Sequence, residues 1–188
     1  MTNVNKLTIK QLHELFEKKT ISPSELLRET MQRARDAEPK INAFRDFTLE
    51  LASESARIAD IKFSTGKSNT QILGIPFSVK DNIDIEGIKS CFGSLSTPGK
   101  PNISAPVVKS LMASGGCLIG KTNMTEFGAK ASSDSPLSGI TSIQEILITR
   151  QVVQVRGLQQ ALQPELLLLQ SAQTVEAPQG YQLHSADW

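Results

Sequence analysis

The sequence predicts an α/β fold, because helix-like and strand-like segments follow one another along its first two thirds. Amphipathic helical patterns come first, and two short apolar runs, beginning at Ile75 and Cys117, then predict buried strands. A further helical pattern separates the two runs. Helix and strand in this order predict layers of helix packed on a sheet.

Length and composition limit the possible classes of protein. The chain has 188 residues, of which 39% are hydrophobic and 21% charged, which suits one globular domain. The net charge of +1 gives no basic footprint for nucleic acid. No apolar run approaches the roughly 18 residues of a membrane span, and the polar N-terminus does not resemble a secretory leader. We therefore expect a cytoplasmic protein without membrane contact.

Three helices are predicted in the N-terminal part. Thr8 can cap a helix that runs to about Lys18, and Ser22 with Pro23 and Glu25 forms a capping-box start for a second helix. Pro39 is expected to end this second helix, before a short extended segment over Ile41–Phe44. The third helix is predicted over Leu49–Phe63.

The central part is expected to carry the sheet. A short buried strand is predicted to end at Lys80 and to run into a polar loop. The segment Gly87–Pro101 is rich in Gly, Ser and Pro and is expected to be irregular. A helix over Ala105–Ser114 and a strand over Cys117–Gly120 follow, and Asn123–Phe127 is expected to begin another helix.

The cysteine and histidine residues indicate no metal site. Cys91 and Cys117 lack the spacing of a zinc site or a disulfide framework and are expected to be buried thiols. His13 and His184 have no partner at catalytic spacing and are expected to be surface residues. We predict neither a cofactor nor a metal.

A nucleotide-binding pattern is present but lies in the wrong context. Gly115–Thr122 satisfies GxxxxGK[ST], which in a true P-loop lies between a strand and a helix. Here a predicted helix precedes the pattern, and its centre is the apolar run Cys117–Ile119. The pattern therefore predicts a buried strand, not a phosphate-binding loop.

Lys80 has two interpretations from the residues alone. A lysine that ends an apolar strand can lose hydration, which favours the neutral amine and allows it to act as a base. The alternative is a solvent-facing lysine that pairs with Asp81 or Asp84. Composition favours the alternative, because most lysines are solvated.

Several motifs in order resemble the amidase-signature family. Leu73–Asn82 is similar to its G-[IV]-P-x-x-[VI]-K-D segment, and Gly93-Ser94 is similar to its Gly-Ser pair. Ala105–Gly116 and Gly120–Phe127 resemble the block that contains GKTNM and EF in that family. The resemblance runs from about Leu7 to Ser142.

The resemblance implies the first, incomplete part of a domain with a mixed β-sheet surrounded by helices. It also implies amide-bond hydrolysis by a triad of a serine, a serine that follows a cis peptide bond, and a lysine. Lys80 falls on the position of the family's catalytic lysine. The resemblance therefore favours the catalytic base over the solvent-facing lysine. The implied substrate is a small-molecule amide, and the oligomeric state is left open. A general amidase and a protein similar to the A subunit of the amidotransferase for glutamyl-tRNA fit equally well.

Residues 143–188 differ in composition from residues 1–142. Ten of the thirteen Gln residues lie there, and neither Lys nor Phe occurs there. The Gly-rich segments that should carry the two catalytic serines are absent. At the corresponding places the chain has Gln151–Val155 and Ala172–Pro178.

A shift of the reading frame explains this change. The shifted frame joins the last base of each codon to the first two bases of the next codon. In this frame, the codons that can encode Gln151–Val155 can also encode Pro-Gly-Gly-Ser-Ser. The same shift lets Ala172–Pro178 encode Gly-Thr-Asp-Gly-Gly-Gly-Ser. We therefore hypothesise that one nucleotide was lost near the codons of Ser142 and Ile143. Residues 1–142 would then be the N-terminal part of the amidase domain, and residues 143–188 an out-of-frame tail without an evolved fold.

This hypothesis has consequences for the chain as it stands. Without the two serines we expect no amide hydrolysis, which leaves a non-catalytic remnant or interaction fragment as the alternative function. A strand that ends at Lys80 without its later neighbours is expected to leave sheet edges and apolar side chains exposed.

Overall fold

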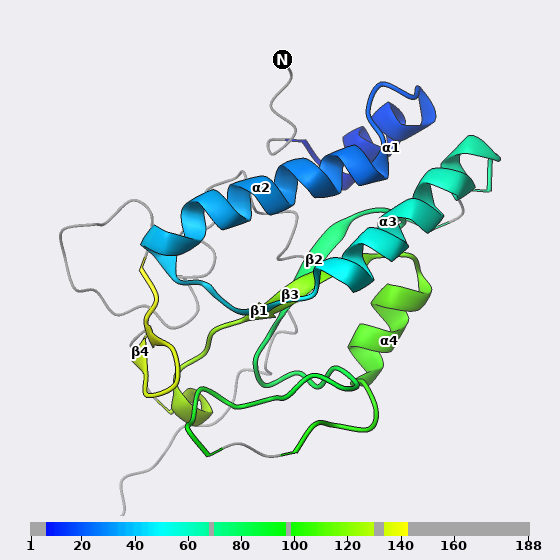
Figure 1. The fold of residues 1–188 in the computed structure, drawn as a ribbon. Coiled ribbons are helices and arrows are strands. Elements are labelled where there is room, and N and C mark those ends of the chain that lie inside the picture. The colour runs from blue at the N-terminus through cyan, green and yellow to red at the C-terminus, as the bar shows by residue number, and fades with distance from the viewer. Residues whose placement is uncertain (1–6, 68–69, 97–98, 130–133, 143–188) are drawn as a thin grey trace, which may run out of the picture.

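The computed structural model describes residues 7–67, 70–96, 99–129 and 134–142, and these form helices around a small mixed sheet (Figure 1). Three strands, β1 (Phe44–Phe47), β2 (Pro76–Lys80) and β3 (Cys117–Thr122), lie in the order β1-β3-β2. β2 runs parallel to β3, and β1 runs antiparallel to it. The predicted α/β class with a mixed sheet is confirmed.

The first two helices begin where their capping residues predict. α1 (Ile9–Glu17) is capped by Thr8, and α2 (Pro23–Ile41) is capped by Ser22 with Glu25 as its capping-box partner. In both caps the side chain of the capping residue and that of the third helical residue each accept a bond from the other's backbone N–H. These reciprocal bonds satisfy donors that the helix itself leaves unpaired.

The prediction that Pro39 ends α2 is wrong, because the helix continues to Ile41. Pro39 lacks the N–H that would donate to the carbonyl four residues earlier, so it removes one backbone bond, but the helix continues to the buried Ile41. The residue that caps the helix, Asn42, adopts the left-handed conformation with φ of 51°. The Glu38 carboxylate accepts the backbone N–H groups of Ala43 and Phe44 and so fixes the exit of the chain.

The extended segment predicted over Ile41–Phe44 lies too early in the chain, because β1 covers Phe44–Phe47. α3 (Leu49–Ser64) follows almost at once and confirms the third predicted helix. Its buried face consists of Ala52, Ala56 and Ala59, whose small side chains let the helix lie close to the sheet.

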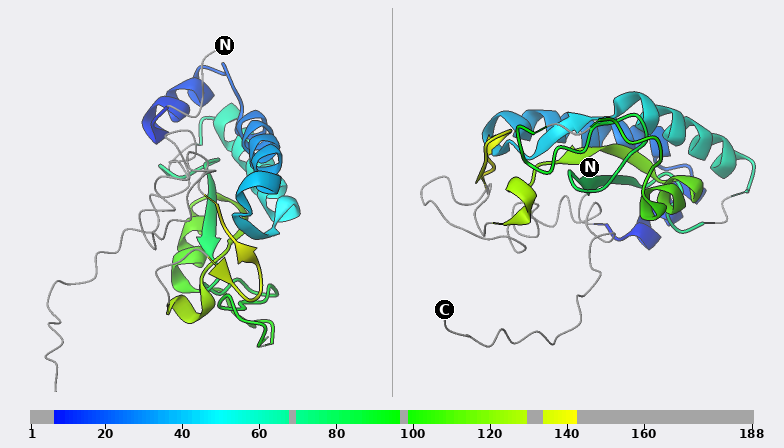
Figure 2. Two further views of the ribbon diagram at one scale, coloured as in Figure 1. Left: turned by 90° about the vertical axis from the view of Figure 1, so that its left-hand side faces the viewer. Right: turned by 90° about the horizontal axis from the view of Figure 1, so that it is seen from below.

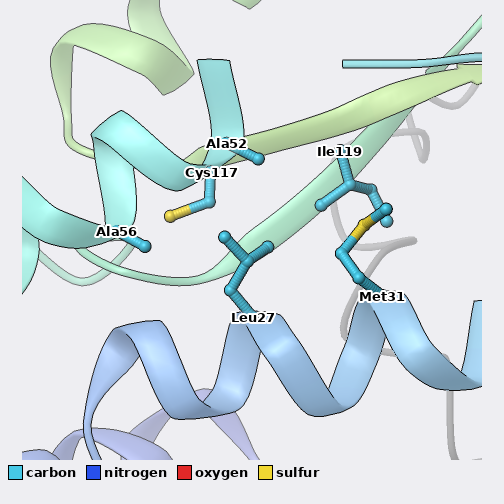
Figure 3. Close-up of a cluster of buried hydrophobic side chains, with 6 residues drawn as sticks. All are labelled: Leu27, Met31, Ala52, Ala56, Cys117 and Ile119. Carbon is cyan, nitrogen blue, oxygen red and sulfur yellow. The ribbon is translucent and has the colours of Figure 1, made fainter. Parts of the chain in front are cut away.

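The sheet is covered on both faces, as the views of Figures 1 and 2 show. On one face, α2 and α3 pack on β3 through the cluster drawn in Figure 3, which comprises Leu27, Met31, Ala52, Ala56, Cys117 and Ile119. On the other face, Val108 of α4 (Pro106–Ala113) packs with Phe77, Val79 and Leu118. Lys80 and Thr122 are the last residues of β2 and β3, and Lys80 is half-buried while Thr122 is buried.

The segment after β3 differs from the prediction. Asn123–Phe127 does not begin an α-helix, and only Glu126–Gly128 forms a 3₁₀ turn, η2. Asn123 is held in another way, since its N–H donates to Ala43 and its amide group donates to the Asn42 carbonyl. A small hairpin of β4 (Asp134–Ser135) and β5 (Gly139–Ile140) was not predicted.

Within the described residues, Gly87–Pro101 contains neither helix nor regular strand, as predicted. None of the described helices is long and apolar enough to cross a membrane. The predicted out-of-frame tail, residues 143–188, lies outside the described residues.

Candidate active site at the ends of strands β2 and β3

Lys80 is the last residue of β2 and pairs in register with Thr122 of β3. The four residues before it in β2 are buried, whereas Lys80 itself is half-buried. Within the described part of the chain, its ammonium group makes no hydrogen bond and no ion pair. The apolar strand thus brings one amine to the edge of the core without tying it to a carboxylate.

The pairing of Lys80 with Asp81 or Asp84 is not found, because both carboxylates have other partners. Asp81 is only 1% exposed and lies 2.8 Å from Nε of Arg45 and 3.6 Å from Nζ of Lys121. Asp84 accepts the hydroxyl hydrogen of Ser90 at 2.6 Å. The solvated ion pair that composition favoured is therefore not the arrangement that the structure shows.

Lys121 lies in the middle of this polar cluster, and its side chain has no exposed surface. Its ammonium donates to the Ser90 hydroxyl at 2.6 Å and to the Lys89 carbonyl at 3.2 Å. Burial lowers the pKa of Lys121, and the nearby Arg45 adds to this effect, while Asp81 and Asp84 oppose it. From the sequence this residue was noted only within the GxxxxGK[ST] pattern and the family block, and its burial among charges was not predicted, although a lysine beside an apolar run is an unusual pattern.

The Asp81 carboxylate also fixes the loop that faces it. One oxygen accepts the N–H of Cys91 at 3.2 Å, and the other accepts the N–H of Gly93 at 3.1 Å. The next residue, Ser94, donates its hydroxyl hydrogen to Glu126 at 2.8 Å. These bonds tie residues 90–94 to the ends of both strands.

Gly93 is required at its position for two reasons. Its φ of 68° is in the left-handed region, which side chains disfavour. A Cβ atom there would also lie 2.4 Å from the Met124 carbonyl oxygen. The predicted Gly-Ser pair, Gly93 and Ser94, is therefore buried next to the strand end that carries Lys80.

The segment that satisfies GxxxxGK[ST] does not form a phosphate-binding loop. Gly120, Lys121 and Thr122 all lie in β3 and are buried. A Cβ atom on Gly120 would lie 2.3 Å from the carbonyl oxygen of Asp46, so the close pairing with β1 explains this glycine. The prediction of a buried strand is confirmed, and the strand extends two residues further than expected.

The remaining candidates are structural. Cys91 and Cys117 are free and buried, as predicted, and burial raises the pKa of the Cys117 thiol to about 12. His13 is not a plain surface residue, because its ring packs against Phe16 and Phe63 and its Nε2 lies 3.2 Å from the Leu73 carbonyl oxygen. His184 lies outside the described residues. The described residues contain no group of three or more His, Cys, Asp or Glu side chains that could hold a metal ion.

Comparison with known proteins points to one family. The sequence model of the family described as Amidase matches residues 25–143. The A subunit of the glutamyl-tRNA(Gln) amidotransferase of Thermoanaerobacter pseudethanolicus is 36% identical over 130 residues, which cover 69% of this chain and 26% of that protein. The protein of the same name from Persephonella marina is 36% identical over 137 residues, which cover 72% and 28%.

Solved structures show the same similarity in three dimensions. A vestigial protein complex that reveals the origins of an s-triazine catabolic enzyme matches with a TM-score of 0.70 and 26% identity, over 74% of this chain and 31% of that one. The native peptide amidase of Stenotrophomonas maltophilia matches in fold with a TM-score of 0.65 and 24% identity, over 71% and 29%. The chain thus spans about a quarter of the length of the curated relatives that it matches.

Proposed function

Because the chain belongs to the amidase-signature family, we propose that it is the lysine-bearing first part of a hydrolase of carbon–nitrogen bonds in carboxamides. Lys80 is the general base in this proposal. The observation that supports it most strongly is the position of Lys80, half-buried at the end of β2, while both neighbouring carboxylates bind other groups.

The chemistry follows from what a neutral lysine can do. Its amine takes a proton from a bridging serine, which in turn takes the proton of the nucleophilic serine as that oxygen attacks the amide carbonyl. The nitrogen leaves as ammonia or an amine after it receives a proton, and water then hydrolyses the acyl-enzyme. Both serines belong to the part of the family domain after residue 142, so the 188-residue chain is proposed to be inactive alone.

Restoration of the reading frame tests this proposal. One nucleotide is inserted between the codons of Ser142 and Ile143, and ammonia release from simple carboxamides is measured for the extended product. We expect hydrolysis that falls by at least about 100-fold in Lys80→Ala, the usual size of a general-base contribution. Lys109→Ala, which changes an exposed lysine of α4, is the control and should retain the activity.

Two results would contradict the proposal. Hydrolysis by the unrestored 188-residue chain that Lys80→Ala abolishes would show that the missing segments are not needed. The DNA after the Ser142 codon is the second test. If none of its frames encodes Gly-Gly-Ser-Ser, the frameshift hypothesis is wrong, and so is the assignment of residues 143–188 as an out-of-frame tail.

A second candidate function is supported by the names of the relatives. The two sequence relatives described above are A subunits of glutamyl-tRNA(Gln) amidotransferases. The frame-restored product would then contribute to amide transfer onto glutamyl-tRNA. A comparison of simple carboxamides with glutamine plus glutamyl-tRNA as substrates distinguishes the two candidates.

A further inference from the structure

The amine of Lys80 is not held in place by a bond of its own. Lys80 ends β2 and is half-buried, and within the described residues its amine makes neither a hydrogen bond nor an ion pair. A lysine side chain has a flexible four-carbon stem, so the backbone alone limits where this amine can reach. The position of the amine therefore depends on how firmly the end of β2 is fixed.

The backbone directly after Lys80 is bonded on both sides of the next residue. The N–H of Asp81 donates to the Thr122 carbonyl at 3.0 Å, which extends the pairing of β2 with β3. The Lys80 carbonyl accepts the N–H of Ile83 at 2.9 Å, and this bond turns the chain out of the strand. Whatever anchors Asp81 therefore also limits the movement of Lys80.

The Asp81 side chain supplies such an anchor from the interior. Its carboxylate is 1% exposed and lies 2.8 Å from Nε of Arg45 in β1 and 3.6 Å from Nζ of Lys121 in β3. One of its oxygens accepts the N–H of Cys91, and the other accepts the N–H of Gly93. A carboxylate suits this position because each of its two oxygens can accept more than one donor. One side chain thus connects all three strands of the sheet with the facing loop.

The two cations beside Asp81 bind the same loop. Arg45 donates to the Lys89 carbonyl, and Lys121 donates to that carbonyl at 3.2 Å and to the Ser90 hydroxyl at 2.6 Å. Networks in which buried donors meet buried acceptors make their surroundings rigid. Asp81 and Lys121 are too buried to touch a substrate, so they can affect a reaction only through the residues that they hold.

We propose that Asp81 is a positioning residue for the amide hydrolysis: it holds the end of β2 so that the Lys80 amine is presented in one direction. Arg45 and Lys121 in turn hold Asp81. The catalytic part of this inference rests on the proposed function, whereas the placement of Lys80 by Asp81 does not. A base that is displaced by about 1 Å loses much of its effect, because proton transfer requires hydrogen-bond distance.

Two variants separate positioning from stability. Asp81→Asn keeps the size of the side chain, but it offers one oxygen to two N–H groups and leaves Lys121 without the carboxylate beside it. Asp81→Asn with Lys121→Met also removes the buried positive charge, while Arg45 keeps its ion pair with Asp46. Removal of both partners of a buried ion pair destabilises less than removal of one. We therefore expect the double variant to unfold at a higher urea concentration than Asp81→Asn.

The rigidity of the backbone is measured on the full 188-residue chain by ¹⁵N relaxation NMR. In the unchanged chain we expect order parameters of about 0.85 for the amides of Lys80, Ile83 and Gly93, the value of a rigid backbone. In both variants these order parameters should fall below about 0.6, although the double variant has regained stability. Asp36→Asn, on the exposed face of α2, is the matched control and should leave them unchanged.

The catalytic consequence is measured on the frame-restored product, as kcat and KM for simple carboxamides. Asp81→Asn and the double variant should lower kcat by at least about tenfold and change KM by less than about twofold. The reason is that a displaced base slows the chemical step more than it weakens substrate binding. Asp36→Asn should retain both constants.

The outcomes distinguish this inference from the proposed function. Rigid amides around Lys80 in Asp81→Asn, or a kcat that returns with stability in the double variant, would overturn the positioning role of Asp81. A frame-restored product that is inactive, or that stays active as Lys80→Ala, would instead contradict the proposed function. The order parameters of the 188-residue chain then still decide whether Asp81 holds the end of β2.

Discussion

The helix-covered side of the sheet and the strand-end region bury opposite kinds of side chain. Between α2, α3 and β3 the buried residues are apolar, with Leu27, Met31 and Ile119 in contact (Figure 3). At the ends of β2 and β3 the buried groups are charged or polar, and the apolar side chains of Leu95 and Phe127 lie outside. The first region is an apolar core, whereas the second is a buried polar cluster that is bordered by exposed apolar side chains.

The largest effect is expected from the buried charge of the strand-end region. Asp81→Ala leaves Arg45 and Lys121 without their shared carboxylate. It also removes the oxygens that accept the backbone N–H groups of Cys91 and Gly93. Loss of one partner of a buried ion pair costs about 3–5 kcal/mol. Urea unfolding should show this loss, whereas Asp36→Ala on the exposed face of α2 should change the free energy of unfolding little. An equal, small effect of both substitutions would contradict a structural role for the Asp81 cluster.

A somewhat smaller effect is expected on the helix-covered side. Leu27→Ala creates a cavity against Cys117 and Ile119, which costs about 3 kcal/mol in a well-packed core. Leu51→Ala, at a side chain that is 41% exposed, is the matched control. If both leucine variants unfold at the same urea concentration, the packing of Leu27 between α2, α3 and β3 does not stabilise the fold.

The helix caps should contribute less to the free energy of unfolding than the Asp81 cluster or the apolar core. Ser22→Ala removes the oxygen that accepts the N–H of Glu25 and should cost about 1 kcal/mol. Ser55→Ala, in the exposed middle of α3, removes a hydroxyl that serves no cap, and it should leave the stability unchanged within about 0.5 kcal/mol. Thermal unfolding of the two variants gives the difference, and a reversed order would show that α2 does not depend on its cap.

The smallest effect concerns pH and His13. Burial lowers the pKa of His13 in the folded chain, although the Leu73 carbonyl and Glu17 oppose this. The unfolded chain therefore binds the proton first, so this contribution to stability is present above about pH 6.5 and is lost as the pH falls below it. His13→Phe keeps a ring against Phe16 and Phe63 and should reduce the loss of melting temperature between about pH 7.5 and pH 5. An unchanged loss would assign the pH dependence to other groups.

Local signals in the sequence predicted most of the helices and both buried strands. Thr8, Ser22 and Pro23 act through neighbours within one helical turn, so their effect can be derived from the sequence alone. The end of α2 could not be derived in this way, because Ile41 and Asn42 are held by contacts with residues far along the chain, among them Asn123 and Ser138.

The candidate site was predictable only in part. Lys80 could be identified from its place at the end of an apolar strand and from the family resemblance, and its catalytic role stays a prediction. The Asp81 cluster could not be derived, since its three charges come from positions 45, 81 and 121 and meet only in the folded sheet. Leu95 and Phe127 are exposed, and the division of the chain at residue 142 stays a prediction.

Gly120 has a consequence for the interpretation of short motifs in genomes. The glycine is needed because the β1 backbone passes 2.3 Å from where its Cβ would lie, and Lys121 lies with Arg45 beside the buried Asp81 carboxylate. Strand crossing and internal charge neutralisation can therefore produce, by convergence, the same letters that ATPases use to hold phosphate. A proteome scan with this pattern will count such chains as ATP-binding proteins unless the preceding segment is required to be a strand.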